Sequence, residues 1–284
     1  MFERIIRSWQ LVKASWGILM EDKKLLAFPF LSGIVTLLVI ATFVLPLILT
    51  DSAYSPSTNS AAGIILLFVF YVVSYFVVIF FNVGLISCVN ARLQGRNMTI
   101  GDGLRTAFRY LGSIFVWAVI AATVGLILRM IEDRAGFLGQ IAAAIAGGVW
   151  SLVTMFVVPV LVFEEKGVFA AMKESLSLFK KTWGESIVGT ISIGLIFGVI
   201  AVVVGLLLAF VTLLTGNFTL FVAALALFIV LVVVLAIIAS AMQGIFTVAL
   251  YTYAKTGQVP PVYDRGLVEQ AFAPAQQQFR PGNI

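Results

Sequence analysis

The fold is decided by the stretch FTLFVAALALFIVLVVVLAIIASAMQGIFTVALYTY, which occupies residues 218–253 and contains no Asp, Glu, Lys or Arg. As a helix it would be about 54 Å long, because each residue adds about 1.5 Å. The hydrocarbon layer of a bilayer is only about 30 Å thick, so the stretch is too long for one span and too short for two spans with a turn. We therefore expect one transmembrane helix that projects beyond the bilayer, with a bend near Gln243-Gly244.

Five further stretches are long and apolar enough to cross a bilayer, and none of them contains Asp, Glu or Lys. Arg129 is the one charged residue inside them, near an end where its stem can reach the headgroups. Of the 284 residues, 61% are apolar and 11% are charged, against roughly 45–50% and 25% in soluble domains. The sequence predicts an all-α polytopic membrane protein with six transmembrane helices arranged as three hairpins. The five stretches cover residues 26–49, 61–89, 112–131, 141–163 and 187–213.

The distribution of positive charge predicts the orientation of these spans. Sixteen of the 18 Lys and Arg residues lie in the N-terminal arm, the second loop, the fourth loop and the tail. Positive residues near span ends stay on the cytoplasmic side. We expect a multi-pass protein of a prokaryotic inner membrane with both termini in the cytoplasm. The net charge of +5 then reflects topology and attraction to the anionic cytoplasmic leaflet, not nucleic-acid binding.

A cleaved signal peptide is the alternative interpretation of the first span, because small residues follow it. Signal-peptide apolar regions contain about 7–15 residues, which is shorter than the stretch 26–49. We expect an uncleaved anchor.

An internal repeat links two basic segments of the chain. Residues 2–17 and 169–184 align without gaps and are identical at six of their sixteen positions. Their apolar residues recur at steps of three and four, as on one face of a helix. A weaker third copy covers residues 104–115. The identical pairs are Phe2, Ser8, Leu11, Lys13, Trp16 and Gly17 with Phe169, Ser175, Leu178, Lys180, Trp183 and Gly184.

Each repeated segment precedes a pair of spans, so we predict three units of one amphipathic helix and one hairpin. The units cover about 1–91, 99–163 and 168–255 of a single transmembrane domain, 1–270, followed by a flexible tail, 271–284. A short amphipathic helix at 264–273 would end the domain. The amphipathic helices either lie at the membrane interface, with Trp as headgroup anchors, or pack together as a cytoplasmic collar.

The second of these segments also carries a motif shared with known proteins. Glu164-Glu165-Lys166-Gly167, followed by Ala170-Ala171, Ser175, Leu178, Lys180 and Trp183-Gly184, resembles a motif of uncharacterised prokaryotic six-span membrane proteins. Those families are distantly similar to the membrane region fused to some glycerophosphodiester phosphodiesterases. The resemblance implies an all-helical bundle of repeated hairpins. The hydrolase chemistry does not carry over, because the fused catalytic domain is absent.

The residue types present argue against an enzyme. The chain has no His and one Cys, Cys88, which excludes ordinary zinc sites, disulfides and histidine-assisted catalysis. Neither a phosphate-binding loop nor a dinucleotide fingerprint occurs. The Glu164–Glu185 region mixes its acids with lysines and predicts a solvated loop. Glu132-Asp133 lies beside Arg129 and Arg134, which favours local ion pairing. We expect no enzymatic activity, no cofactor and no metal.

Polar and small residues inside the spans suggest either a path or close helix packing. Hydroxyls and amides can line a passive conduit or form interhelical hydrogen bonds. We expect a passive channel or transporter-like assembly of identical subunits. A structural or lipid-organising scaffold is the alternative, and a lipid-acting enzyme comes third. The polar candidates are Ser74, Asn82, Ser87, Asn90, Ser151, Thr154, Ser240 and Gln243, and the small packing candidates are Gly194, Gly198, Ala143, Gly147, Ala144 and Gly148.

Overall fold

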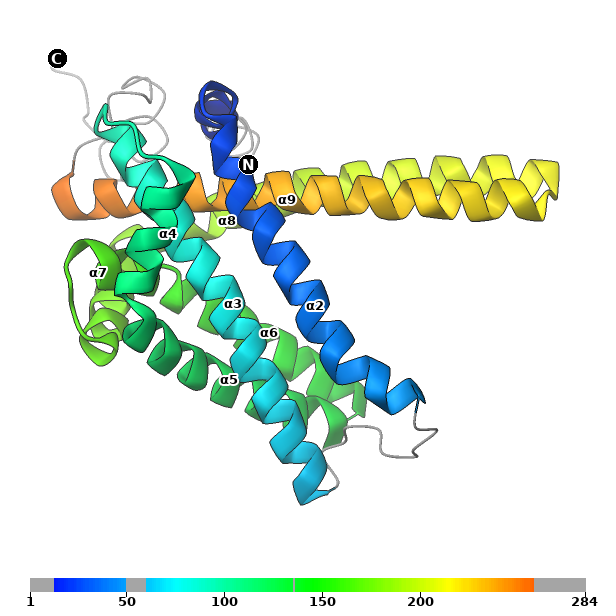
Figure 1. The fold of residues 1–284 in the computed structure, drawn as a ribbon, viewed down its shortest axis with the longest axis horizontal. Coiled ribbons are helices and arrows are strands. Elements are labelled where there is room, and N and C mark those ends of the chain that lie inside the picture. The colour runs from blue at the N-terminus through cyan, green and yellow to red at the C-terminus, as the bar shows by residue number, and fades with distance from the viewer. Residues whose placement is uncertain (1–12, 50–59, 135, 258–284) are drawn as a thin grey trace, which may run out of the picture. The chain divides into compact units, whose positions relative to one another are not determined.

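The computed structural model describes residues 13–49, 60–134 and 136–257, and within them it is helical with no strand. Six helices are long and apolar enough to cross a membrane, as predicted. Residues 13–21 are also helical. The remaining elements are η1 (Lys23–Leu26), α2 (Ala27–Leu49), α3 (Ala61–Leu93), α4 (Ile100–Arg109), α5 (Leu111–Arg134), α6 (Gly136–Thr154), α7 (Val157–Phe163), α8 (Val168–Thr215) and α9 (Phe218–Thr256) (Figure 1).

These elements form two compact units. One unit comprises Lys24–Lys181, and the other comprises Met1–Lys23 together with Thr182–Ile284. The boundary falls within α8, at Thr182, whose backbone is non-helical with φ −122° and ψ 22°. The first part of α8, residues 168–181, therefore belongs to one unit and its second part belongs to the other.

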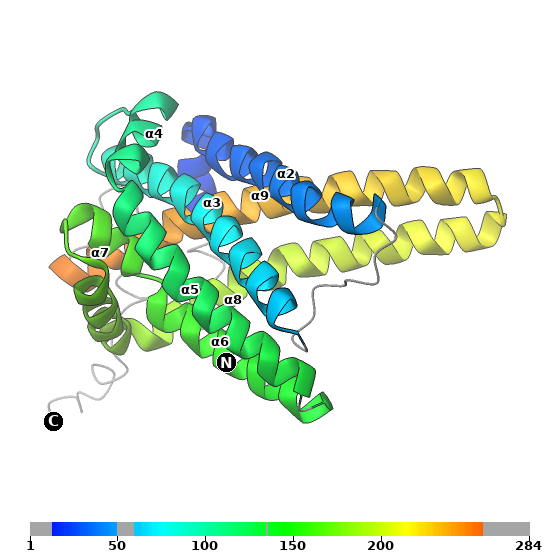
Figure 2. The ribbon, with the colours of Figure 1, turned by 60° about the horizontal axis from the view of Figure 1, so that its bottom comes forward.

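In the unit Lys24–Lys181, α3 packs against α2, α4, α5 and α7 (Figure 2). α2 runs antiparallel to α3, because Phe28 lies against Gly84 while the rings of Phe43 and Phe70 meet at 5.4 Å near the other end. α5 and α6 form the next hairpin. These two helices are joined by the stacked indoles of Trp117 and Trp150, whose ring centroids are 5.9 Å apart.

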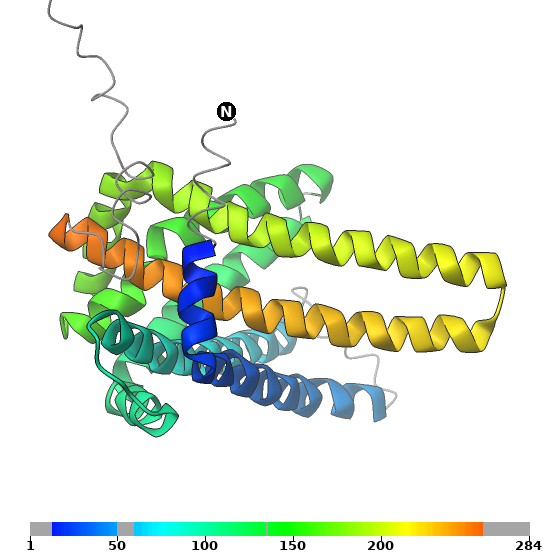
Figure 3. The same cartoon turned by 90° about the horizontal axis from the view of Figure 1, so that it is seen from above.

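In the second unit, the latter part of α8 and α9 lie side by side as an antiparallel hairpin (Figure 3). The turn uses Gly216 at φ 59°, a conformation that suits residues without a Cβ. Asn217 caps α9, since its Oδ1 accepts hydrogen bonds from the backbone of Thr219 and Leu220. The predicted bend near Gln243-Gly244 is wrong, because α9 is one helix throughout.

The fourth predicted span, 141–163, is found at Gly136–Phe163, and its helix is interrupted. α6 ends at Thr154 and α7 begins at Val157. Pro159 explains the interruption, because its ring would clash with the carbonyl of Met155 in a continuous helix. Pro46, by contrast, lies inside α2, which continues to Leu49.

Burial changes abruptly along α3 and α9. In α3, only Gly63, Val77 and Ile79 are buried before residue 83, whereas every residue of 83–89 is buried. In α9, no residue before Ala241 is buried, and burial is nearly continuous from there to Tyr251. The exposed parts, 61–82 and 218–240, measure about 33–35 Å as helices, close to the hydrocarbon thickness. In α3 and α9, most of the residues that exceed the hydrocarbon thickness are therefore buried, from residue 83 and from residue 241 onward.

Candidate functional site

Many of the buried residues of the unit Lys24–Lys181 lie in a collar at the end of α3. We define the collar as residues 83–93 of α3, residues 168–181 of α8, and the whole of α4 and α7. Its elements surround one helix break and one close backbone crossing. These two features fix the geometry of the region.

The crossing joins α3 to α4. A Cβ added to Gly103 would lie 2.9 Å from the carbonyl oxygen of Gly84 and 2.8 Å from Cys88 Sγ. A Cβ on Gly84 would lie 2.5 Å from the ring of Phe28, which fills the space beside both glycines. Only residues without a side chain permit this approach. Cys88 Sγ also donates to the carbonyl oxygen of Thr99 at 3.6 Å.

The start of α4 is fixed by a reciprocal cap. Thr99 Oγ1 accepts from the backbone N–H of Asp102 at 3.2 Å, and Asp102 Oδ2 accepts from the N–H and hydroxyl of Thr99 at 3.1 and 2.7 Å. These bonds favour the carboxylate form. The hydrogen bonds from Thr99 therefore hold the pKa of Asp102 below its ordinary value, with a smaller contribution from Arg105.

The break between α6 and α7 is bridged by one serine from α8. Ser175 Oγ accepts from the backbone N–H of Phe156 at 3.2 Å and donates to the carbonyl oxygen of Val153 at 2.6 Å. Ser175 is fully buried, with 0% of its surface exposed. Backbone groups that the broken helix cannot satisfy by itself are thus satisfied by a side chain, as apolar surroundings require. Ser175 is one of the residues that the repeat singled out.

A tyrosine closes the other end of α7. The hydroxyl of Tyr110, which caps α4, donates to the carbonyl oxygen of Val162 at 3.1 Å and lies 3.3 Å from Glu165 Oε1. Burial raises the pKa of Tyr110, and the nearby Glu165 raises it further. In the same loop Lys166 pairs with Glu164 at 2.7 Å and with Glu174 at 3.3 Å. These pairs raise the pKa of Lys166 and fit the expected balanced loop.

The packed faces of the amphipathic helices include small residues, while several large apolar residues are exposed. In α4, Gly103 and Ala107 are buried while Phe108 is 61% exposed. In α8, Ala171, Ser175 and Leu178 are buried while Phe169 is 75% exposed and Leu176 is 38% exposed. In each helix one buried small residue directly precedes a large exposed one, Ala107 before Phe108 and Ser175 before Leu176.

The N-terminal copy follows the same pattern where it is described. Ser15 is buried and Trp16 is 40% exposed, while Lys13 is exposed, as Lys180 is in α8. Phe2, Ser8 and Leu11 lie outside the described residues, as do 258–284 with the predicted helix 264–273. The side chains of Trp183 and Gly184 are not described either.

The polar candidates of the spans differ in exposure and in hydrogen bonding. The hydroxyls of Ser87 and Thr154 donate to carbonyls four residues earlier in their own helices, at 2.7 Å each. Ser151 and Ser240 are exposed, while Asn82, Asn90 and Gln243 are partly exposed. Asn90 accepts from Gln94 in the adjoining turn at 3.3 Å. The hydrogen bonds of Ser87, Thr154 and Asn90 are therefore intrahelical or local.

Ser74 differs from the other candidates. Its Oγ is buried and has no hydrogen-bond partner among the described residues. It lies one residue from Tyr75, whose hydroxyl oxygen would be 3.2 Å from a Cβ on Gly125 of α5.

The small packing candidates divide into two groups. Gly147 and Ala143 are half-buried, and a Cβ on Gly147 would meet Leu128 of α5 at 3.5 Å. A Cβ on Gly194, Gly198 or Gly148 would meet nothing within 4 Å, and Ala144 is exposed. Only the Ala143–Gly147 face therefore contacts a neighbouring helix within its own unit.

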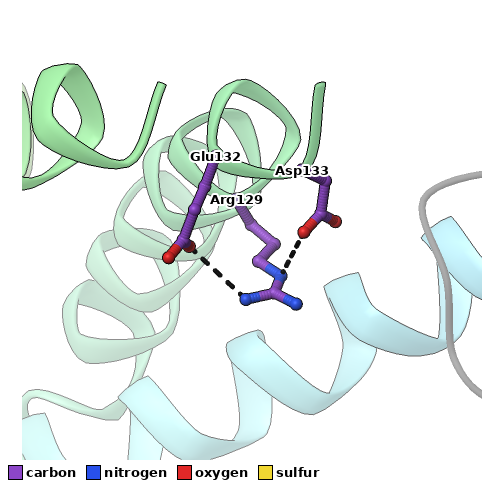
Figure 4. Close-up of polar contacts among 3 residues, drawn as sticks. All are labelled: Arg129, Glu132 and Asp133. Atoms are coloured by element: carbon purple, nitrogen blue, oxygen red, sulfur yellow. Dashed lines mark hydrogen bonds and ion pairs between the residues drawn. The ribbon is translucent and has the colours of Figure 1, made fainter. Parts of the chain in front are cut away.

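The far end of α5 carries the ion pairs expected there. Arg129 Nη1 lies 3.4 Å from Glu132 Oε2, and Arg129 Nε lies 3.2 Å from Asp133 Oδ1 (Figure 4). All three side chains are partly exposed, so each pair contributes little stability. Among the residues that the structure covers, no three His, Cys, Asp or Glu side chains are grouped as metal ligands would be.

Sequence reasoning missed Tyr110, Phe28 and the two crossing glycines. Tyr110 carried a signal, since it is a polar aromatic residue at the end of an amphipathic segment. The glycines carried none, because glycine is common in membrane helices.

Comparison with known families identifies the family of the chain. Residues 61–260, which include every collar element, match the model of a family of unknown function. The chain belongs to DUF6159. Membership in DUF6159 agrees with the expected uncharacterised family of membrane proteins, and it provides no connection to glycerophosphodiester phosphodiesterases. A search of curated proteins finds no match for this DUF6159 chain.

Proposed function

We propose that this integral membrane protein is a non-enzymatic, lipid-organising scaffold of a prokaryotic inner membrane, with both termini in the cytoplasm. One observation supports the proposal above the others. Residues 83–89 of α3 in the collar are all buried, whereas only 6% of the most apolar stretches of the first two spans is buried, against 28% and 39% in the third and fourth. A protein built in this way leaves lipid-accessible surface along much of the length of its first two spans.

The arrangement of the polar candidates supports the same proposal. A conduit within one subunit requires polar groups from several helices to meet along a path. The hydroxyls of Ser87 and Thr154 are instead directed to their own helices. The apolar and basic residues on the outer faces of α4 and residues 168–181 of α8 suit the headgroup region.

Lipid demixing in vesicles tests the scaffold proposal. The full chain would be reconstituted with a small fraction of headgroup-labelled anionic lipid, and self-quenching of the label would be measured against protein density. We expect quenching to increase with protein density for the anionic lipid and to stay constant for a zwitterionic lipid with the same label. Equal behaviour of the two lipids would refute the proposal.

A passive channel or transporter-like assembly of identical subunits is the second candidate, and the broken fourth span favours it. Interrupted helices occur at binding sites of transporters, where free backbone carbonyls face a cavity. The break at Met155-Phe156 is of this kind, although Ser175 occupies part of its hydrogen-bonding capacity. Planar-bilayer recording under voltage and tension, with subunit counting in native nanodiscs, tests this candidate. The absence of current in these recordings would refute the channel proposal.

A further inference from the structure

We propose that α4 is a binding helix for anionic phospholipid, with Phe108 at the edge of the hydrocarbon and with Arg105 and Arg109 at the phosphate layer. This inference builds on the proposed scaffold and names the chemical partner of its collar. It depends on the depth of α4, on the residues of its outer face and on the local balance of charge.

Three contacts give the direction of α4 along α3. Cys88 meets Thr99, Gly84 meets Gly103, and the rings of Phe80 and Phe108 meet at 5.0 Å. As the residue number increases in α4, the number of its partner in α3 decreases. The C-terminal end of α4 therefore points toward residues 61–82, the exposed part of α3.

The depth of α4 in the bilayer follows if the hydrocarbon boundary is taken as the point where α3 changes from exposed to buried. The change falls between residues 82 and 83, and each residue adds about 1.5 Å. Thr99, opposite Cys88, is then about 8 Å outside the hydrocarbon boundary. Phe108, opposite Phe80, is about 4 Å inside it. An interfacial helix is buried to a similar depth of about 5–10 Å.

The outer face of α4 has the composition that this depth requires. Gly103 and Ala107 are on the buried face of α4, and Phe108 is exposed. Past the end of α4, Leu111 is also exposed and Phe115 of α5 is 53% exposed, so the apolar surface continues into a span. Arg105 and Arg109 are exposed beside it, with stems long enough to reach the phosphates.

The local charge favours an anionic lipid over a zwitterionic one. Residues 83–115 contain four basic side chains, Arg92, Arg96, Arg105 and Arg109, and one acidic side chain, Asp102. Asp102 is engaged with Thr99 in the cap. A basic residue close to an anionic leaflet contributes attraction of about 1 kcal/mol.

Lipid affinity is the first measurement. The full chain, purified in a neutral detergent, would be titrated with phosphatidylglycerol or phosphatidylcholine and analysed by native mass spectrometry. The double variant R105Q/R109Q should bind phosphatidylglycerol about 10- to 30-fold more weakly, from about 1 kcal/mol per lost charge. Its affinity for phosphatidylcholine should not change. R129Q/R134Q, which removes the same charge at the other end of α5, should retain full affinity. Equal loss in the two double variants, or loss in neither, would overturn the inference.

Depth is the second measurement. Spin labels at F108C and G101C would be compared for collision with oxygen, which is enriched in lipid, and with a water-soluble nickel chelate. The wild-type chain serves as the blank, because its one cysteine, Cys88, is buried. We expect oxygen access at position 108 and chelate access at position 101. Chelate access at 108 would place the face in water, and protection from both reagents would place it under a second copy; either result overturns the inference. A scaffold that failed the demixing test would leave both measurements unaffected.

Discussion

Replacement of Ser175 by alanine tests how the broken fourth span is held together. The change removes the acceptor for the Phe156 N–H and the donor to the Val153 carbonyl oxygen. Both bonds lie at a side chain with no exposed surface, so water cannot replace them. A buried polar group that loses its partner costs about 1–3 kcal/mol, and we expect S175A to lower the free energy of unfolding by that amount.

Ser177 provides a matched control two residues away. It lies in the same part of α8 and is exposed. S177A gains the same helix propensity, a few tenths of a kcal/mol, without losing a described bond. Unfolding would be followed in mixed micelles by SDS titration, with the fluorescence of the five tryptophans, which include the stacked Trp117–Trp150 pair, as the signal. If S175A and S177A unfolded within about 0.5 kcal/mol of each other, Ser175 would not support the break.

Three further predictions concern the rest of the collar. G103A should lower the free energy of unfolding by about 1–3 kcal/mol through overpacking. G33A, whose added methyl meets nothing within 4 Å, should raise it by about 0.5–1 kcal/mol. If the SDS titration showed that both variants change the stability in the same direction, the close approach of Gly84 and Gly103 would be contradicted. The pKa of Asp102 is lowered in the folded protein, so its stabilisation is present above the unfolded value of about 3.9 and is lost as pH falls through the folded value. D102N should therefore reduce the unfolding midpoint at pH 7 and leave it unchanged in strong acid. A difference between wild type and D102N that did not vary with pH would refute the role of the Asp102 carboxylate in the cap. Y110F, which removes the hydroxyl that donates to α7, should cost about 0.5–1.5 kcal/mol, measured as a shift in the same titration.

Hydropathy predicted the spans well because each one must contain an unbroken apolar stretch. The first, second and third spans are found at Lys23–Pro46, Ala61–Leu93 and Leu111–Arg134, within a few residues of their predicted bounds. The ion pairs of Arg129 were also predicted, because their partners are three and four residues away on one helix.

Periodicity could not identify which face of each amphipathic helix packs against protein. Lipid tails are as apolar as a protein core, so large apolar residues such as Phe169 gain no preference for the inside. Close packing in membranes instead selects small residues, and Ala171 and Ser175 occupy the buried positions. A helical wheel weighted toward small residues would have found this face.

The break in the fourth span depends on one side chain from a distant element. Pro159 indicated a disturbance, since proline disfavours a continuous helix. Whether the helix bends or breaks depends on a partner for the freed backbone groups, and that partner, Ser175, is supplied by α8. No local pattern contains this information.

The change from exposed to buried residues along α3 has a consequence for how the protein responds to bilayer thickness. Few residues in the most apolar stretches of the first two spans are buried, while the collar holds α3 at one end. A thicker or thinner bilayer changes the tilt of such helices at a cost of a fraction of a kcal/mol per Å of mismatch. Residues 61–82 of α3, together with the neighbouring helices that they contact, can therefore follow the membrane while the Gly84–Gly103 crossing and the Ser175 bridge keep their geometry.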